Sequence, residues 1–301
     1  MTVLLTLMAS ALGSRVGFVL DLVDRLEEQQ RALEAAEGVV DLARALVAQD
    51  PTPGYDSPVE GWIRLGAWQT LRTPEVEVDL GGGLVDEDRK LNLNSAPVEV
   101  LARFFQKQGL GQEEGRKMAE AVVDWRDKDD HELPDGAEGF YYRGLEDAYD
   151  AKNGPFESLE EILLVRGMTP ELWQTCSRFL TVYGSGSVNL NGVPKEVLVA
   201  LGLSVRGVQG FLAYRSGEDG QDGTADDETF FSVNVALEEL RTHVPAEDLA
   251  LLSRLRDDGL VGVASKVFSL SVTAKASGSK APVHIGSVLD REGQILAWRE
   301  S

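Results

Sequence analysis

Two loops rich in carboxylates are the part of this sequence best suited to chemistry. The first runs from Asp124 to Asn153, and the second runs from Gly217 to Glu228. Carboxylates this close repel one another, and a hard cation bound between them would relieve the repulsion and order the loop. Calcium suits such loops because it accepts about six to eight oxygen ligands with tolerant geometry. The loops therefore favour calcium binding, and a solvated acidic loop remains the alternative for each.

The two loops differ in how strongly their other residues favour an ordered metal site. Trp125, Tyr141 and Tyr142 indicate an ordered structure around the first loop. The second loop has Gly220 and Gly223 for tight turns, and its candidate ligands come from charge alone. These candidates are Asp219, Asp222, Asp226 and Asp227. Neither loop fits the EF-hand pattern, and zinc is disfavoured because the only cysteine lies elsewhere and one histidine is too few.

Other kinds of chemistry find little support. Cys176 is the only cysteine, and the three histidines show no motif spacing. A covalent nucleophile or an acidic hydrolase would need a constellation that the sequence does not offer. We therefore expect no enzyme activity and no small-molecule substrate. The formal net charge of −21 also disfavours binding to phosphate backbones, which require Lys and Arg.

The N-terminal region predicts one long helix. Residues 1–14 carry no charged side chain, and Arg15 follows them. As a helix, this stretch rises about 21 Å, which is short of the roughly 30 Å hydrocarbon core of a bilayer. From residue 15 to about residue 49, one apolar stripe recurs at helical spacing and ends before Pro51. We expect residues 1–50 to form a membrane anchor and amphipathic helix whose leader lies upstream, and an ordinary N-terminal helix is the alternative.

An internal repeat organises the middle of the chain. Leu91–Leu101 matches Val188–Leu198, and both segments continue into a Gly-containing hairpin, a second helix and an acidic loop. Asn94 and Asn191 are predicted to cap the following helices, and a capping box is expected at Ser158 and Glu161. Residues 90–256 are therefore expected to form an inserted all-α domain with repeats that resemble helix-hairpin-helix modules. A nucleic-acid-binding protein of that kind is the alternative function, although no basic run follows the hairpins.

Strand patterns flank this helical region on both sides. Short strands are expected at 61–65, 75–80, 84–85 and 90–91, with a hairpin turn at Asp86–Arg89. After the insertion, strands are expected at 267–274, 283–289 and 294–298. Residues 51–89 and 257–301 would thus build one sheet interrupted by the insertion. The fold class is α+β, with a long N-terminal helix packed on an antiparallel sheet.

Several fragments resemble the general secretion pathway protein K family, the largest minor pseudopilins of type II secretion. One fragment is the acidic run that continues into Asn-Leu-Asn and ends at Asn94. Further fragments that resemble the family occur in the first acidic loop and after it. These fragments are Asp86–Asn94, Asp124–Asp130, Gly136–Glu138, Tyr141–Tyr142, Asn153–Phe156, Ser158–Ile162 and Val165–Gly167. The absence of an acidic residue before Asp21 also agrees with this family.

The resemblance implies a pilin-like fold and calcium bound in the inserted domain. The positions that match the family's metal ligands are Asp124, Asp127, Asp129, Asp130, Glu138 and Asn153. It also implies a complex with the I and J minor pseudopilins at the tip of the pseudopilus, where the chain supports export of folded proteins across the outer membrane. The expected location is the bacterial inner membrane, crossed once, with the C-terminal bulk in the periplasm and no nucleic-acid partner.

Overall fold

The chain folds into two compact units. The computed structural model describes residues 2–61, 70–279 and 281–301. The helix–sheet unit comprises Met1–Asp50, Gly61–Val85 and Ser269–Ser301. The helical unit comprises Pro51–Glu60 and Asp86–Phe268.

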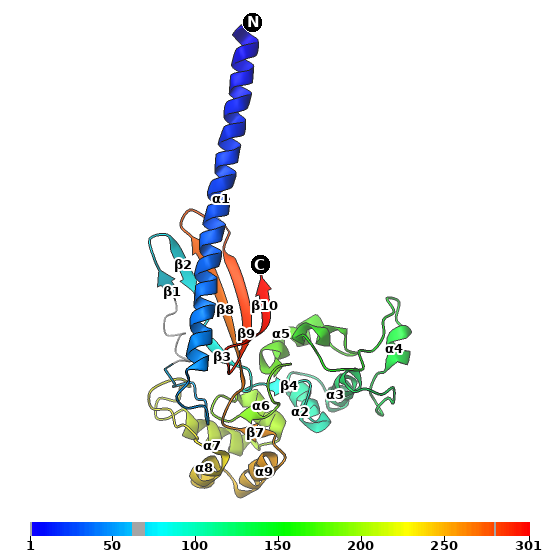
Figure 1. Cartoon of the computed structure of the whole chain (residues 1–301). Helices are drawn as coiled ribbons and strands as arrows, with labels where there is room; N and C mark the ends of the chain where they lie inside the picture. The colour runs from blue at the N-terminus through cyan, green and yellow to red at the C-terminus, as the bar shows by residue number, and fades with distance from the viewer. Residues whose placement is uncertain (1, 62–69, 280) are drawn as a thin grey trace. The chain divides into compact units, whose positions relative to one another are not determined.

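Helix α1 spans Thr2–Ala48 and agrees with the predicted amphipathic helix (Figure 1). Its second half packs on the sheet of the same unit through a buried stripe of small and β-branched residues: Ala32, Ala36, Val39, Val40, Ala43 and Val47. The three alanines let the helix axis lie close to the strands. Burial of this stripe, rather than helix propensity, is what stabilises α1 against the sheet.

No helix in the described part of the chain combines the length and the apolar content that a membrane crossing requires.

The sheet of the helix–sheet unit has the order β1-β2-β8-β9-β10, and β3 also pairs with β8. Its strands are β1 Thr70–Arg72, β2 Val76–Asp79, β3 Leu84–Asp86, β8 Val267–Ala276, β9 Val283–Asp290 and β10 Ile295–Glu300. The pairs β1–β2, β2–β8 and β9–β10 are antiparallel. Strands β8 and β9 alternate buried and more exposed residues, as a sheet with one covered face requires. Residues 62–65 of the predicted 61–65 strand lie outside the described residues.

The prediction of a hairpin turn at Asp86–Arg89 is wrong. Strand β3 pairs with β8, whereas β4 (Leu91–Asn92) pairs with β5 (Leu180–Thr181). Buried carboxylates hold this loop instead, because Asp86 Oδ1 accepts a hydrogen bond from Asp88 N at 2.8 Å. Asp88 Oδ2 in turn accepts one from Lys266 N at 2.6 Å.

The helical unit contains two similar halves around one apolar core. The first half holds α2 Val98–Lys107, α3 Gln112–Arg126, α4 Gly139–Arg143, η2 Leu159–Leu164, α5 Pro170–Cys176 and η3 Ser177–Phe179. The second half holds α6 Lys195–Leu201, α7 Val205–Arg215, α8 Val233–Glu239, η4 Leu240–Thr242 and α9 Ala246–Asp257. Besides the predicted helices, each half has a parallel strand pair. These pairs are β4–β5 in the first half and β6 (Val188–Asn189) with β7 (Val261–Gly262) in the second.

The repeated Asn-Leu-Asn segments perform the same task in both halves, but this task is not helix capping. The N-caps of α2 and α6 are Pro97 and Pro194, and neither has a side-chain cap. Instead, Asn94 Oδ1 accepts a hydrogen bond from Phe156 N at 2.7 Å, and Asn191 Oδ1 accepts one from Phe230 N at 2.8 Å. Each asparagine thus fastens the chain that returns from an acidic loop. The capping box at Ser158 and Glu161 is confirmed.

An arginine at the end of the second helix of each repeat completes the pattern. Arg126 donates to the carbonyl oxygens of Leu93 and Ala96. Arg215 donates in the same way to Leu190 O and Val193 O. Each arginine therefore holds the Asn-Leu-Asn segment against its own helix hairpin. Arg126 lies at the start of the first acidic loop, and the second acidic loop begins at Gly217, two residues after Arg215.

Candidate metal centre

Two carboxylates of the first acidic loop lie on the last turn of α3. Asp124 and Asp127 are three residues apart, so their side chains share one face of the helix. Asp124 is completely buried, and Asp127 is half-buried at the C-cap. The C-terminus of a helix carries partial negative charge, which makes it a poor place for anions unless a cation is near. A cation bound at the end of α3 would therefore stabilise these two carboxylates.

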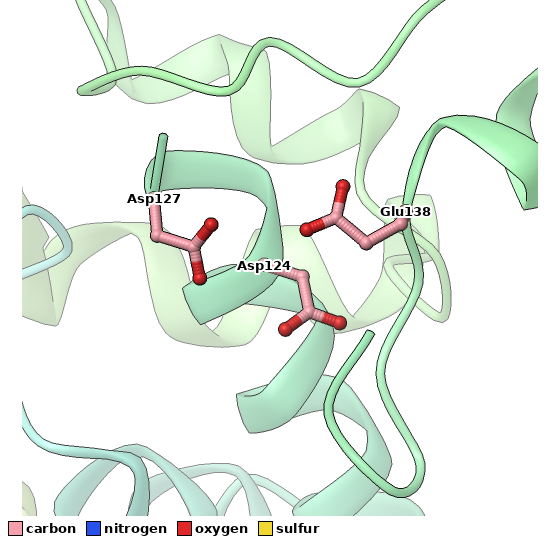
Figure 2. A group of neighbouring side chains, drawn as sticks. All are labelled: Asp124, Asp127 and Glu138. Atoms are coloured by element: carbon pink, nitrogen blue, oxygen red, sulfur yellow. The ribbon is translucent and has the colours of Figure 1, made fainter. Parts of the chain in front are cut away.

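Glu138 brings a third carboxylate to the end of α3 from the N-cap of α4. One carboxylate oxygen from each of Asp124, Asp127 and Glu138 lies within 4.8 Å of the others. Figure 2 shows the carboxylates of Asp127 and Glu138 turned toward each other, with that of Asp124 close by. Glu138 is only 3% exposed, and neither of its oxygens has a hydrogen-bond partner of normal geometry among the described residues. A buried carboxylate in that condition is costly, and a bound cation would remove the cost.

Asn153 supplies a further unsatisfied oxygen near the same loop. Its Oδ1 is buried and has no hydrogen-bond partner in the described part of the chain. Its Nδ2 donates to Asp129 O at 3.2 Å and to Asp130 Oδ1 at 2.9 Å, which fixes the orientation of the amide. The φ angle of Asn153 is +47°, a strained value that tertiary contacts must enforce. An amide oxygen is a normal calcium ligand, so Asn153 fits the same donor set.

The pKa values at this site reflect the crowding of carboxyls. Burial raises the pKa of Glu138 to about 7, and the charges of Asp124 and Asp127 add to the shift. Burial also raises the pKa of Asp124 to about 6, and it raises the pKa of Asp127. Three neighbouring carboxyls that all resist ionisation are typical of a site that needs an added positive charge.

The framework around the site is closely packed and includes residues that the sequence did not single out as functional. A Cβ on Gly136 would lie 1.8 Å from Asp124 Oδ2, so only glycine allows the loop to come this close. Arg166 holds the loop from outside, because its Nη1 donates to Gly136 O at 2.7 Å and its guanidinium stacks on Tyr141. Arg166 lies in the family-like Val-Arg-Gly segment, which was the only sequence signal for it. Trp125 packs edge-on against Tyr142 beneath the site.

The predicted ligands of the first loop fall into two groups. Asp124, Asp127 and Glu138 come together, and Asn153 brings an unsatisfied oxygen nearby. Asp129 Oδ1 instead accepts hydrogen bonds from His131 N at 2.8 Å and pairs with His131 Nδ1 at 3.1 Å. The His131 N–H lowers the pKa of Asp129, in contrast to the raised values of the carboxyls that gather. Asp130 contacts the Asn153 amide, so it orients a candidate ligand.

The second acidic loop also gathers three carboxylates, but they are more exposed. Oxygens of Asp219, Asp226 and Asp227 lie within 4.8 Å of one another. Asp226 Oδ2 already accepts hydrogen bonds from Glu218 N at 2.8 Å and Asp219 N at 3.1 Å. Asp222 is not part of this group, because it forms an ion pair with the buried guanidinium of Arg215 at 2.8 Å. Main-chain donors and Arg215 therefore satisfy much of this loop without a metal.

An internal carboxylate lies at the hairpin that begins α7. Asp248, which is buried on α9, accepts hydrogen bonds through Oδ1 from Ser204 N at 2.8 Å and through Oδ2 from Ser204 Oγ at 2.6 Å. A Cβ on Gly207 would lie 2.2 Å from Asp248 Oδ2. The start of a helix attracts anions, and here an acid of the same chain takes that place.

We expect Asp248→Ala to lower the free energy of unfolding of the chain by about 1.5–3 kcal/mol, the usual value of hydrogen bonds to a charged group. Urea unfolding followed by circular dichroism measures the change. Glu247→Ala, at the exposed neighbouring position, is the matched control and should change stability by less than about 0.5 kcal/mol. Equal stability of Asp248→Ala and the wild type would contradict this role.

The arrangement defines a class of α+β protein, in which a long helix packs on an antiparallel sheet and a helical unit carries a candidate cation site. Residues 82–185 match the family described as type II secretion system (T2SS), protein K. This stretch includes both the Asn-Leu-Asn segment of the first repeat and the whole first acidic loop.

Known proteins with similar sequences and structures belong to the same system. Type II secretion system protein K of Aeromonas hydrophila is 28% identical over 177 residues, which cover 56% of this chain and 53% of that protein. The protein of the same name from Klebsiella pneumoniae is 25% identical over 203 residues, covering 62% of this chain and 61% of that protein. The matches thus span between half and two thirds of these curated relatives.

A chain in the crystal structure of the GspK–GspI–GspJ complex from enterotoxigenic Escherichia coli has a similar fold. The TM-score is 0.71, the sequence identity is 16%, and the match covers 93% of this chain and 99% of that chain. At this identity the likeness speaks for the fold alone. The sequence matches are to the type II secretion system protein K family, and residues 82–185 carry the match to that family.

Proposed function

We propose that the chain is a minor pseudopilin that caps the tip of the type II secretion pseudopilus, and that it does so by binding and not by catalysis. In this role it assembles with the counterparts of GspI and GspJ and supports export of folded proteins across the outer membrane. The match of residues 82–185 to the protein K family and the similarity to two curated proteins of that name support this proposal. The inner membrane and the periplasm are the proposed location for the same reason.

The observation that carries the proposal is an apolar stripe on α1 that extends beyond its own sheet. Between Ala32 and Val47 the stripe is buried on the strands. At helical spacing toward the N-terminus it continues as Leu26, Leu22 and Phe18, which are 56%, 47% and 70% exposed. An apolar row on an exposed helix suits the side of another amphipathic helix, as in helix bundles. Neighbouring pseudopilins would offer such helices.

A metal in the helical unit would serve this binding function by holding its surface in one conformation. Asp124, Asp127, Glu138 and Asn153 fit calcium, because all offer oxygen and two have buried oxygens without partners. When bound, the ion would neutralise the crowded carboxylates at the end of α3. The group around Asp219, Asp226 and Asp227 is a second, weaker candidate, since main-chain donors already serve it.

Binding of nucleic acid by the helix-hairpin-helix-like repeats is the alternative, and two observations disfavour it. The net charge of −21 opposes phosphate contacts. In addition, the carboxylate of Asp248 occupies the start of α7, where a phosphate would otherwise bind.

Co-purification with the two partner pseudopilins tests the proposed assembly. We expect the full wild-type chain to co-purify with both counterparts and the double variant Leu22→Lys/Leu26→Lys to lose them. Burying one leucine contributes about 1.5–3 kcal/mol, so each substitution should weaken association at least about tenfold.

Asp24→Lys is the matched control, because residue 24 lies on the other side of α1 from the stripe and is exposed. This variant should keep both partners. If the double variant assembled as well as the wild type, the stripe would not be the docking surface. If the wild type failed to bind either partner, the proposed function itself would be contradicted.

A further inference from the structure

Three buried carboxyls lie together in the helical unit, far in sequence from both acidic loops. Asp56 and Asp88 are 0% and 2% exposed, and Asp86 is 9% exposed. Asp56 belongs to the short first segment of the unit, Pro51–Glu60, and Asp86 is the first residue of its second segment. The cluster therefore lies where separate segments of this unit meet.

Neutral hydrogen-bond donors hold the cluster together. Asn189 Nδ2 donates to Asp86 Oδ2 at 2.9 Å, to Asp56 O at 3.0 Å and to Ser265 Oγ at 2.9 Å. Ser265 N donates to Asp56 Oδ2 at 2.6 Å. Asp88 Oδ1 accepts from Ser185 N at 3.0 Å. The donors come from strand β6, from the segment after β7 and from the segment before β6, so the carboxyls connect distant parts of the unit.

The positive charges near the cluster are engaged elsewhere. Lys90 pairs with Glu87 at 2.5 Å, and Arg215 pairs with Asp222 at 2.8 Å. Lys266 contributes its main-chain N–H to Asp88. Arg89 lies beside Gly192, whose position is also close to Asp86. Among the described residues, no Lys or Arg forms an ion pair with Asp86 or Asp88, so neutral donors alone hold these two carboxyls there.

We propose that the cluster of Asp56, Asp86 and Asp88 holds one proton in the folded helical unit, seated on Asp86, and that this proton makes the unit a pH-sensitive clasp. At mildly acidic pH the neutral carboxyl fits its buried place. As the pH rises, the proton must leave or the segments must separate. The segments are thus held most firmly at mildly acidic pH and less firmly once the pH has risen to about 7.

The electrostatics of Asp86 agree with this proposal. Burial raises its pKa to about 7, and the charges of Asp88 and Asp56 add to the shift against the hydrogen bonds from Ser265 and Asn189. Burial also raises the pKa of Asp88. In the unfolded chain an aspartate has a pKa of about 3.9. The folded state therefore binds more protons between about pH 4 and pH 7, and stability falls as the pH rises through that window.

The test compares the wild-type chain with Asp86→Asn, which mimics the neutral acid. The unfolding equilibrium constant is measured in urea between pH 5 and pH 8, for the full chain, in saturating calcium and again in chelator. We expect the ratio of the wild-type unfolding constant to that of Asp86→Asn to increase as the pH is raised toward 7. The increase should be up to about tenfold per pH unit. At pH 8 Asp86→Asn should be the more stable protein. The wild-type amides of residues 52–60 and 262–267 should also exchange faster at pH 8 than at pH 6, after correction for the intrinsic rates.

Asp258→Asn is the control, since it makes the same chemical change at an exposed position of the helical unit. Its pH profile should match that of the wild type. Asp56→Asn is a second variant, and it should lessen the pH dependence because it removes one of the charges that keep Asp86 protonated. Parallel profiles of wild type and Asp86→Asn from pH 5 to pH 8 would overturn the proposal. A difference present only in chelator would also overturn it, because it would belong to the metal centre.

Discussion

Saturating calcium is expected to raise the unfolding temperature of the helical unit, and Glu138→Gln is expected to remove most of that rise. A ligand at about 100 times its dissociation constant stabilises the folded state by about 2.7 kcal/mol. For a unit of this size, the shift is roughly 5–10 °C. Glu138 matters most because it is buried and both of its oxygens lack partners among the described residues. Differential scanning calorimetry with calcium and with chelator measures the shift.

In chelator, the wild type should lose its advantage in unfolding temperature over Glu138→Gln. Without a metal, Glu138→Gln removes one of three crowded carboxylates, so the variant should be at least as stable as the wild type. Asp147→Asn is the matched control, because it changes an exposed acid of the same loop and should leave the calcium effect intact. If calcium left the wild-type unfolding temperature unchanged, the site would not be a metal centre.

Asn191→Ala is expected to cost about 2–5 kcal/mol of unfolding free energy. The substitution leaves two buried main-chain groups of Phe230 without their partners, since Asn191 binds both the N–H and the carbonyl oxygen. Each buried group left unsatisfied costs about 1–3 kcal/mol. Urea unfolding, followed by circular dichroism, gives the value.

The repeat supplies an internal comparison for this prediction. Asn94 makes the same two bonds to Phe156 but is only half-buried, so Asn94→Ala should cost less than Asn191→Ala. Asn234→Ala is the control on an exposed position of α8 and should cost less than about 1 kcal/mol. A loss below that level for Asn191→Ala would show that the fastening of Phe230 does not stabilise the fold.

Much of the architecture could be predicted from the sequence, because periodic patterns dominate it. The apolar stripe predicts α1, period-two alternation predicts β2, and strand-like segments predict β8 and β9. These signals are local, because burial of one apolar face stabilises the helix or strand whose periodicity places the apolar residues on that face. The internal repeat likewise predicts two related helical halves, and the structure contains them.

Features that depend on contacts distant in sequence were not predictable in the same way. Asn94 and Asn191 have the residue type of a helix cap, but their side chains bind segments 62 and 39 residues away. The run at Asp86–Arg89 has the composition of an exposed turn, yet its carboxyls are buried against donors that come from later in the chain. Neither the main-chain partners of the two asparagines nor the donors to the buried carboxyls can be deduced from local composition.

The candidate metal centre shows the same limit of local reasoning. An acidic loop predicts that some of its carboxylates lie close together, and Asp124, Asp127 and Glu138 do so. Which acids face inward depends on the path of the chain. His131 engages Asp129, and Arg215 engages Asp222, so neither carboxylate joins its neighbours.

Site-specific crosslinking in secreting cells tests most directly the central claim that α1 docks this chain into a pseudopilus. A photoreactive amino acid would replace Leu22, which is exposed on the stripe beyond the sheet. The account predicts crosslinks to the GspI and GspJ counterparts, and no such crosslinks from the same probe at Asp24. Crosslinks absent from Leu22 in cells that produce all three proteins and secrete normally would contradict it.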